Sequence, residues 1–265
     1  YSATQNNSAL NETLIGYRYP AINQVGPLLS TEWHQYAPYN DSCVNNYPAG
    51  CGVIAAAQVM KYHEHPSSPF SLNGDSFSWS DIPVSPTSTP NKIPQFIKGL
   101  GVLFNTTYGP SESSTDLLDI FYGLFDLDYY VHYDQTNDEY TYRYRIMNEH
   151  NPVIMYGWES DASSALSHAW VCDGVRQAVY NQLQFFTENQ PYGAGNFTQG
   201  MYTISNPGLI GQPVGSPIYT YHMNWGMIIT SYNGWFAANY NFSTPLNFNC
   251  RRKNMCPALT YTSVE

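Results

Sequence analysis

The order of its helix-like and strand-like segments is the feature that most constrains how this 265-residue chain can fold. Between Gly50 and residue 148 the sequence favours helices. After Asn151 it turns to short aromatic or β-branched runs, closed by glycine or turn residues. Helices followed by strands indicate an α+β fold rather than a doubly wound parallel sheet. We therefore predict one domain over residues 1–265, α-rich from about 30 to 150 and β-rich from about 151 to 265.

Four helices and four strands are expected. The clearest helix runs from Gly50 to His63, a stretch of small and apolar residues that Pro66 must stop. Weaker helices are predicted at residues 93–104, 115–127 and 139–148, and strands at 152–157, 168–174, 218–226 and 234–239. The first 30 residues are interpreted as an extended wrap. Residues 67–92, rich in Ser, Pro, Asn and Gly, are interpreted as a surface loop.

Composition excludes several classes of protein. The chain has 20 acidic and 10 basic side chains, a formal net charge of −10, so few cations are available to replace the counterions of nucleic acid. Its 16% aromatic content rules out disorder, and no apolar run approaches the roughly 20 residues that span a bilayer. A surface of uncharged polar groups suits a secreted, extracellular protein. Because the chain starts at Tyr1 without a signal stretch, we expect a processed product.

Five cysteines leave one thiol over if the others pair as disulfides. Cys250 and Cys256 are close in sequence and are the expected pair. The spacing contains no Cys-x-x-Cys, so neither a zinc ribbon nor a thioredoxin motif is indicated. His63-Glu64-His65 is not a zinc pattern either, because alternate residues do not share a helix face. We expect no metal and no cofactor.

Cys51 lies between Gly50 and Gly52 at the start of the clearest helix. The unpaired amides and the dipole at a helix N-terminus stabilise a thiolate, and a nearby imidazolium lowers the thiol pKa further. His168, which opens a strand, would supply that imidazolium if helix and sheet pack face to face. The alternative for Cys51 is a buried structural cysteine, and for His168 a histidine without a catalytic role.

Four blocks in fixed order resemble the streptopain family of papain-like cysteine peptidases. Gly50-Cys51, Ala57–His63 and Pro66 resemble its active-site helix. The other blocks are Thr31–Gln35 with Pro38–Asn40, Ser167–Gly174 preceded by Pro152–Gly157, and His222–Gly226 with Asn233–Phe236. The resemblance covers residues from about 27 to 250, which is nearly the whole chain.

This resemblance implies a papain-like fold and a secreted endopeptidase made as an inactive precursor, acting on proteins or peptides and inhibited by its own propeptide. Cys51 would attack the scissile carbonyl, with His168 as its base and then as the acid for the leaving amine. Gln35 and the Cys51 amide would bind the oxyanion. Asn224 or Trp225 would orient His168, and the sequence leaves that choice open.

Two departures from the family pattern concern the neighbourhood of these residues. Gly52 stands where the family usually has Val, and Met227–Thr230 replaces a Trp and glycines that form a mobile loop. The bulkier loop puts substrate preference in doubt and could narrow the cleft. The alternative functions are a papain-fold amidase or transglutaminase, and a catalytically inactive relic that binds glycans or proteins through exposed Tyr, Trp and Asn.

Overall fold

The computed structural model describes residues 13–18, 21–162, 166–179, 183–188, 197–201, 217–237, 248 and 250–259. The chain forms two compact units. The smaller comprises Tyr1–Asn23 and Arg176–Tyr219, and the larger Gln24–Val175 and Thr220–Glu265. The α-rich part predicted at about 30–150 lies wholly within the larger unit. The assignment of residues 1–265 to a single domain stays a prediction.

The smaller unit contains a three-stranded antiparallel sheet in the order β1-β8-β9. Its strands are β1 (Thr13–Arg18), β8 (Leu183–Glu188) and β9 (Phe197–Met201). None of them was expected from the sequence, and the prediction of an extended wrap for the first 30 residues did not foresee the pairing of β1 with β8.

Four helices form at the predicted positions in the larger unit, with ends within two residues of the expected ones. They are α1 (Cys51–His63), α2 (Ile93–Leu103), α3 (Leu117–Asp126) and α4 (Glu139–Glu149). The Asp116 side chain accepts from the amide of Leu118 and caps α3, and Asp138 caps α4 through Thr141. Local capping signals therefore account for these boundaries.

The large sheet has the strand order β11-β10-β7-β6-β12-β5, and β2 (Ala21–Val25) also pairs with β7. The strands are β5 (Tyr130–Asp134), β6 (Val153–Trp158), β7 (Ser167–Val179), β10 (Pro217–Asn224), β11 (Gly234–Ala237) and β12 (Cys250–Ala258). The pairs β6–β7, β6–β12, β5–β12 and β10–β11 are antiparallel. This arrangement confirms the predicted α+β class, while β5 and β12 were not predicted.

Residues 67–92 do not form only a surface loop, so that prediction was wrong in part. They contain a hairpin of β3 (Phe70–Leu72) and β4 (Asp75–Phe77), followed by a 3-10 turn over Trp79–Asp81. The rings of Phe70, Phe77 and Trp79 are buried and pack against Phe96 of α2. Burial of these aromatic side chains outweighs the turn-rich composition of the segment.

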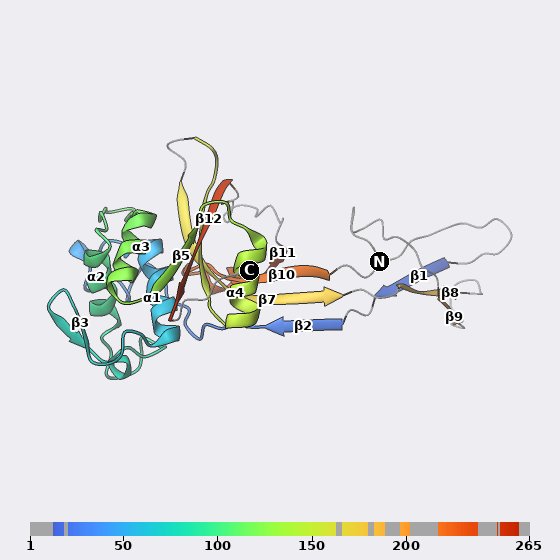
Figure 1. Ribbon diagram of the computed structural model, residues 1–265, viewed down its shortest axis with the longest axis horizontal. Helices are drawn as coiled ribbons and strands as arrows, with labels where there is room; N and C mark the ends of the chain where they lie inside the picture. Colours follow the sequence, from blue (N-terminus) through green and yellow to red (C-terminus); the bar gives the residue numbers. More distant parts are fainter. Residues whose placement is uncertain are drawn as a thin grey trace. The chain divides into compact units, whose positions relative to one another are not determined.

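Helix α1 occupies the centre of the core, because every residue from Gly52 to Met60 is buried. It contacts α2, α3 and β6, whereas α4 packs against β6 and β12. Figure 1 shows α1, α2 and α3 grouped beside the large sheet. The helix that begins at Cys51 is therefore held between the other helices and the sheet. Within the described residues no helix has both the length and the apolar character that crossing a bilayer requires.

The expected disulfide between Cys250 and Cys256 is wrong. Both cysteines lie in β12, where six residues of extended chain separate their Cα atoms by roughly 20 Å, far beyond the ~7 Å limit for a disulfide. Cys256 is a free buried thiol, as are Cys43 and Cys172, and Cys51 is also free.

Candidate active site

Cys51 is the first residue of α1, and Gly50 before it has φ +95°, a conformation that side-chain-bearing residues rarely adopt. The backbone amides of Ala169, Gly52 and Cys51 itself lower the pKa of the Cys51 thiol, so the Ala169 amide lies near that thiol. Ala169 directly follows His168 in β7. The structure thus brings the start of α1 against the strand that carries His168, as the predicted pairing of these residues requires.

His168 lies in β7 opposite Gly157 of β6 and is 5% exposed. Its Nε2 is 2.8 Å from the backbone carbonyl oxygen of Trp225. A carbonyl can only accept, so Nε2 carries the proton and the neutral ring keeps its Nδ1 lone pair. The ring centroid lies 5.1 Å from Phe248 and 6.2 Å from Trp225, so aromatic rings confine the imidazole.

At this site burial disfavours the Cys51 thiolate alone and the His168 imidazolium alone. Desolvation raises the pKa of the Cys51 thiol, while the amides of Ala169, Gly52 and Cys51 act in the opposite direction and Glu112 raises it. Desolvation also lowers the pKa of His168 to about 4, against the hydrogen bond to Trp225, which raises it. Proton transfer from thiol to imidazole creates two opposite charges side by side without adding net charge. The attraction between them offsets part of the desolvation cost.

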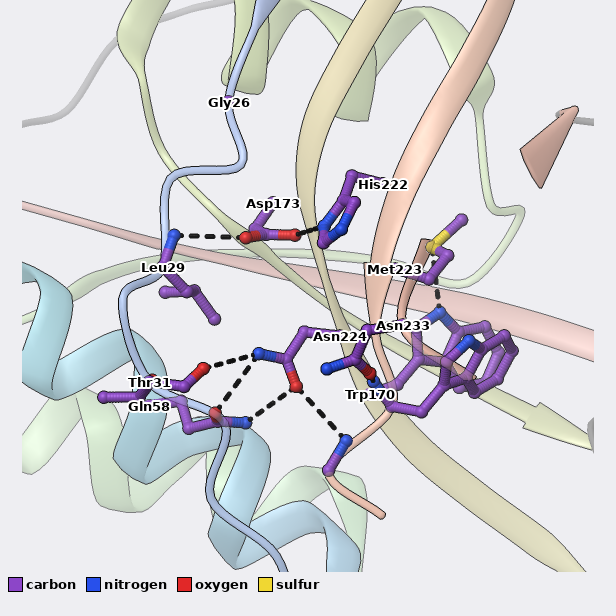
Figure 2. A network of polar contacts seen from close by, with 12 residues as sticks. Gly26, Leu29, Thr31, Gln58, Trp170, Asp173, His222, Met223, Asn224 and Asn233 are labelled. Carbon is purple, nitrogen blue, oxygen red and sulfur yellow. Dashed lines mark hydrogen bonds and ion pairs between the residues drawn. The ribbon is translucent and has the colours of Figure 1, made fainter. Parts of the chain in front are cut away.

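Asn224, at the end of β10, makes its hydrogen bonds to α1 and the N-terminal segment. Its Nδ2 donates to the carbonyl oxygen of Thr31 at 2.7 Å and to Oε1 of Gln58 at 3.3 Å. Gln58 is fully buried in α1, and its Oε1 also accepts from the amide of Trp33 at 3.0 Å. Figure 2 shows the two amide side chains facing each other between α1 and β10. This amide pair joins the helix of Cys51 to the strand end that precedes Trp225.

The N-terminal segment that leads to Gln35 is held to the sheet by Asp173. The Asp173 carboxylate accepts from the amide of Leu29 at 3.1 Å and lies 2.6 Å from Nδ1 of His222 (Figure 2). The Asp173 carbonyl accepts from the amide of Leu28 at 2.8 Å. Gly26 passes so close to the backbone of Asp173 that a Cβ at that position would collide with the Asp173 carbonyl. The route of residues 26–29 is therefore set by β7.

Gln35 is half-buried, and its backbone lies at the start of α1, because its carbonyl oxygen accepts from the amide of Ala49 at 2.8 Å. Ala49 stands two residues before Cys51. The chain therefore folds back past the helix start, which the predicted oxyanion role of Gln35 requires.

Residues 226–233 form a turned loop in place of the glycine-rich loop of the family. Gly226 has φ +62°, and a Cβ there would lie 3.3 Å from Cγ2 of Ile54 in α1. The loop contains a 3-10 turn over Thr230–Tyr232, and the side chains of Ile228 and Ile229 are more than half exposed. The loop thus starts beside α1 and exposes two apolar side chains, and the expected narrowing of the cleft stays a prediction.

The space beside Gly52 is filled by a residue that the sequence did not point to. A Cβ on Gly52 would lie 2.6 Å from Cδ1 of Ile120, a fully buried side chain of α3. Gln58, Asn233 and Phe248 were likewise given no role from the sequence. A single polar residue in the apolar run of residues 53–60 was the available signal for Gln58, whereas the contact of Phe248 depends on the tertiary structure alone.

None of the described His, Cys, Asp and Glu side chains gather in groups of three or more that could hold a metal ion. The residues that the structure brings together are a thiol, an imidazole, amide side chains and backbone amides. Such a set can perform thiol–imidazole nucleophilic catalysis.

Comparison with known proteins supplies independent findings. The peptidase C10 family model matches residues 33–236. The solved structures similar to this chain include two from Prevotella intermedia. Active wild-type interpain A cysteine protease has a TM-score of 0.55 at 17% identity, covering 88% of this chain and 94% of that one. A mutant fragment of prointerpain A has a TM-score of 0.55 at 19% identity, covering 91% and 73%. No curated protein matches the chain.

Proposed function

This chain belongs to the peptidase C10 family and is a cysteine-type endopeptidase, and from that premise we propose that Cys51 is its nucleophile and His168 its general base. One observation carries the proposal: the thiol at the start of α1 is near enough to the backbone amide of Ala169, next to His168 in β7, for that amide to lower the thiol pKa. The family match confirms the resemblance read from the sequence, and the similar structures support the papain-like fold.

In the proposed mechanism the His168 ring accepts the thiol proton at Nδ1, since Nε2 is occupied by the Trp225 carbonyl. The thiolate then attacks the scissile carbonyl, and the imidazolium returns its proton to the leaving amine. Water, activated by the neutral imidazole, hydrolyses the acyl-enzyme and regenerates the thiol. The orienting group for His168 is the backbone carbonyl of Trp225 rather than the side chain of Asn224, whose amide bonds to Thr31 and Gln58.

The oxyanion of each tetrahedral intermediate would be bound by the backbone amide of Cys51 and the side-chain amide of Gln35. The proximity of the Gln35 backbone to Ala49 supports this assignment, because it places the residue at the helix start. Donors aimed at a developing oxyanion stabilise the transition state more than the substrate, so they act on kcat.

The substrates are proteins or peptides, as the family implies. We also propose secretion and synthesis as a precursor whose propeptide inhibits the enzyme. The surface rich in uncharged polar groups supports secretion, and the similarity to a fragment of prointerpain A supports the precursor.

The test is cleavage of denatured casein by the wild type, Cys51→Ala and Cys43→Ala. Cys43 is a matched control because it is also a free thiol, buried before the same helix. We expect fragments from the wild type and Cys43→Ala and none from Cys51→Ala. Activity of Cys51→Ala within about tenfold of the wild type would refute the proposed nucleophile. Amine incorporation without fragmentation would indicate a transglutaminase, and no reaction by any variant would indicate the inactive relic.

A further inference from the structure

The group that holds His168 is the backbone carbonyl of Trp225. The position of this carbonyl therefore depends on the contacts that hold residues 224–226. The Trp225 carbonyl accepts from Nε2 of His168 at 2.8 Å. That carbonyl and the amide of Gly226 belong to one planar peptide group, so restraining one edge of the plane orients the other. The preceding peptide group carries the amide of Trp225. The two peptide groups on either side of the Trp225 Cα thus determine where the carbonyl points.

Each of these peptide groups is held by an asparagine side chain. Oδ1 of Asn233 accepts from the amide of Trp225 at 2.8 Å, and Oδ1 of Asn224 accepts from the amide of Gly226 at 3.3 Å. Both asparagine side chains are labelled in Figure 2. The shorter of the two hydrogen bonds is the one made by Asn233, which stands at the far end of the loop.

The position of Asn233 is itself fixed by contacts of its backbone. It follows the 3-10 turn over Thr230–Tyr232 and immediately precedes β11, and its own amide donates to the carbonyl of Thr230 at 2.9 Å. Its side chain is half-buried and closes the eight-residue span back to Trp225. The backbone of Asn233 is therefore anchored on both sides, and its side chain transmits that anchoring to Trp225.

We propose that Asn233 is a positioning residue for His168, acting through the backbone of Trp225. This inference rests on the proposed function, in which His168 forms an ion pair with Cys51. The Asn233 side chain keeps the Trp225 carbonyl at the distance and angle at which it accepts a hydrogen bond from Nε2–H of His168. The hydrogen bond from Nε2–H is stronger when the ring is charged. By holding Trp225, Asn233 therefore favours the imidazolium of His168 and hence the thiolate of Cys51.

The direction of this effect agrees with the electrostatics of the site. The hydrogen bond to Trp225 raises the pKa of His168, against the lowering by burial. The rings of Trp170, Trp225 and Phe248 surround the imidazole and bring no charge to it. Misplacing the Trp225 carbonyl therefore removes one interaction that supports the charged ring, and the population of thiolate at acidic pH falls.

The experiment measures the rate of Cys51 carboxamidomethylation by iodoacetamide against pH, followed by mass spectrometry of the Cys51 peptide. This readout needs no peptide substrate. At about pH 5.5 a reactive thiolate exists only as the ion pair, whereas at about pH 9.5 the imidazole is neutral and the thiolate that forms has no help from an imidazolium. The variants are Asn233→Ala, which removes the acceptor, and Asn233→Asp, which keeps an oxygen in its place. Asn91→Ala is the control, because the Asn91 side chain likewise braces a loop, bonding to Pro86 and Ile93.

We expect Asn233→Ala to lower the rate about tenfold at the acidic pH and less than about twofold at the alkaline pH, as for the loss of one hydrogen bond to a charged group. Asn91→Ala should stay within about twofold of the wild type at both pH values, and Asn233→Asp, whose carboxylate still accepts and whose charge favours the imidazolium, should be no more than about twofold slower. An Asn233→Ala protein that matches the wild type at the acidic pH overturns the inference. An equal loss at both pH values, with no rescue by aspartate, also overturns it and shows a merely structural role.

The rate measured for the wild type distinguishes a failure of this inference from a failure of the proposed function. Wild-type Cys51 that reacts at acidic pH no faster than a free thiol contradicts the ion pair itself, and with it the proposed function. Wild-type Cys51 that reacts fast, with Asn233→Ala unchanged, contradicts only the role of Asn233. Thermal unfolding of each variant, monitored by circular dichroism, verifies that the altered proteins are folded during the measurement.

Discussion

Replacing Gly52 with alanine tests how the helix of the proposed nucleophile is packed, because two opposing effects of known size act at this position. Alanine is favoured over glycine within a helix by about 0.5–1 kcal/mol. Its new Cβ, however, would lie 2.6 Å from Cδ1 of Ile120, well inside the 3.5–4.0 Å of a favourable carbon contact. Overpacking of a core typically costs about 1–3 kcal/mol. We therefore expect Gly52→Ala to lower the free energy of unfolding by about 1–2 kcal/mol.

The partner change is Ile120→Val, which deletes the Cδ1 atom that causes the collision. Ile120 is fully buried, so this change alone should cost about 0.5–1.5 kcal/mol. In the double variant the alanine methyl occupies part of the vacated space, and the next nearest atom, Cβ of Thr115, is at an ordinary 3.8 Å. The double variant should then lie within about 1 kcal/mol of the wild type, a coupling of about 2 kcal/mol in favour of the pair.

The assay is equilibrium unfolding in urea of the wild type, both single variants and the double variant, followed by circular dichroism. Destabilisations that add within about 0.5 kcal/mol would show that Gly52 and Ile120 do not compete for one space, and would refute the reasoning. A Gly52→Ala protein more stable than the wild type would show that Ile120 moves aside at little cost, leaving the helix preference as the larger effect.

Gln35→Ala should lower kcat on a peptide substrate by roughly a hundredfold and change KM little, because the lost donor acts on the developing oxyanion; a nearly silent substitution would place Gln35 outside the oxyanion site. Gln58→Leu should lower the free energy of unfolding by about 1–3 kcal/mol, since the amides of Trp33 and Asn224 lose a buried acceptor, and urea unfolding with no loss would contradict this. Burial lowers the pKa of His63 to about 4, so between about pH 6.5 and 4 the unfolded chain binds more protons than the folded protein at this residue. The free energy of unfolding should therefore decrease as the pH is lowered through that window. The contribution of His63 to this decrease is at most about 1.4 kcal/mol per pH unit. His63→Gln should show a correspondingly shallower decline, and an unchanged slope in unfolding measured against pH would disprove the contribution of His63.

The sequence by itself determined the helices and the α+β class, and it predicted Cys51 as the nucleophile, because these inferences depend on neighbouring residues. The caps at Asp116 and Asp138 and the stop before Pro66 act within one or two turns of helix, so the four helices could be predicted nearly to their ends. The position of Cys51 at a helix start is equally local. The family resemblance then supplied His168 and Gln35, whose separation in sequence from Cys51 prevents any local argument.

Tertiary structure alone decided which contacts cross between distant segments. The pairing of β12 with β5 and β6 joins residues about 90 to 130 positions apart, and no local pattern identifies the partner of a strand, even where strand-forming residues are present as in β5. Burial of Trp79 and Phe77 overrides a sequence that is typical of a surface loop. The group that holds His168 is a backbone carbonyl, which every residue carries and which no sequence pattern can single out. The side chains of Asn224 and Asn233 bond to the peptide groups on either side of it, and they come together only after β10 has met α1 and β11 has paired with β10.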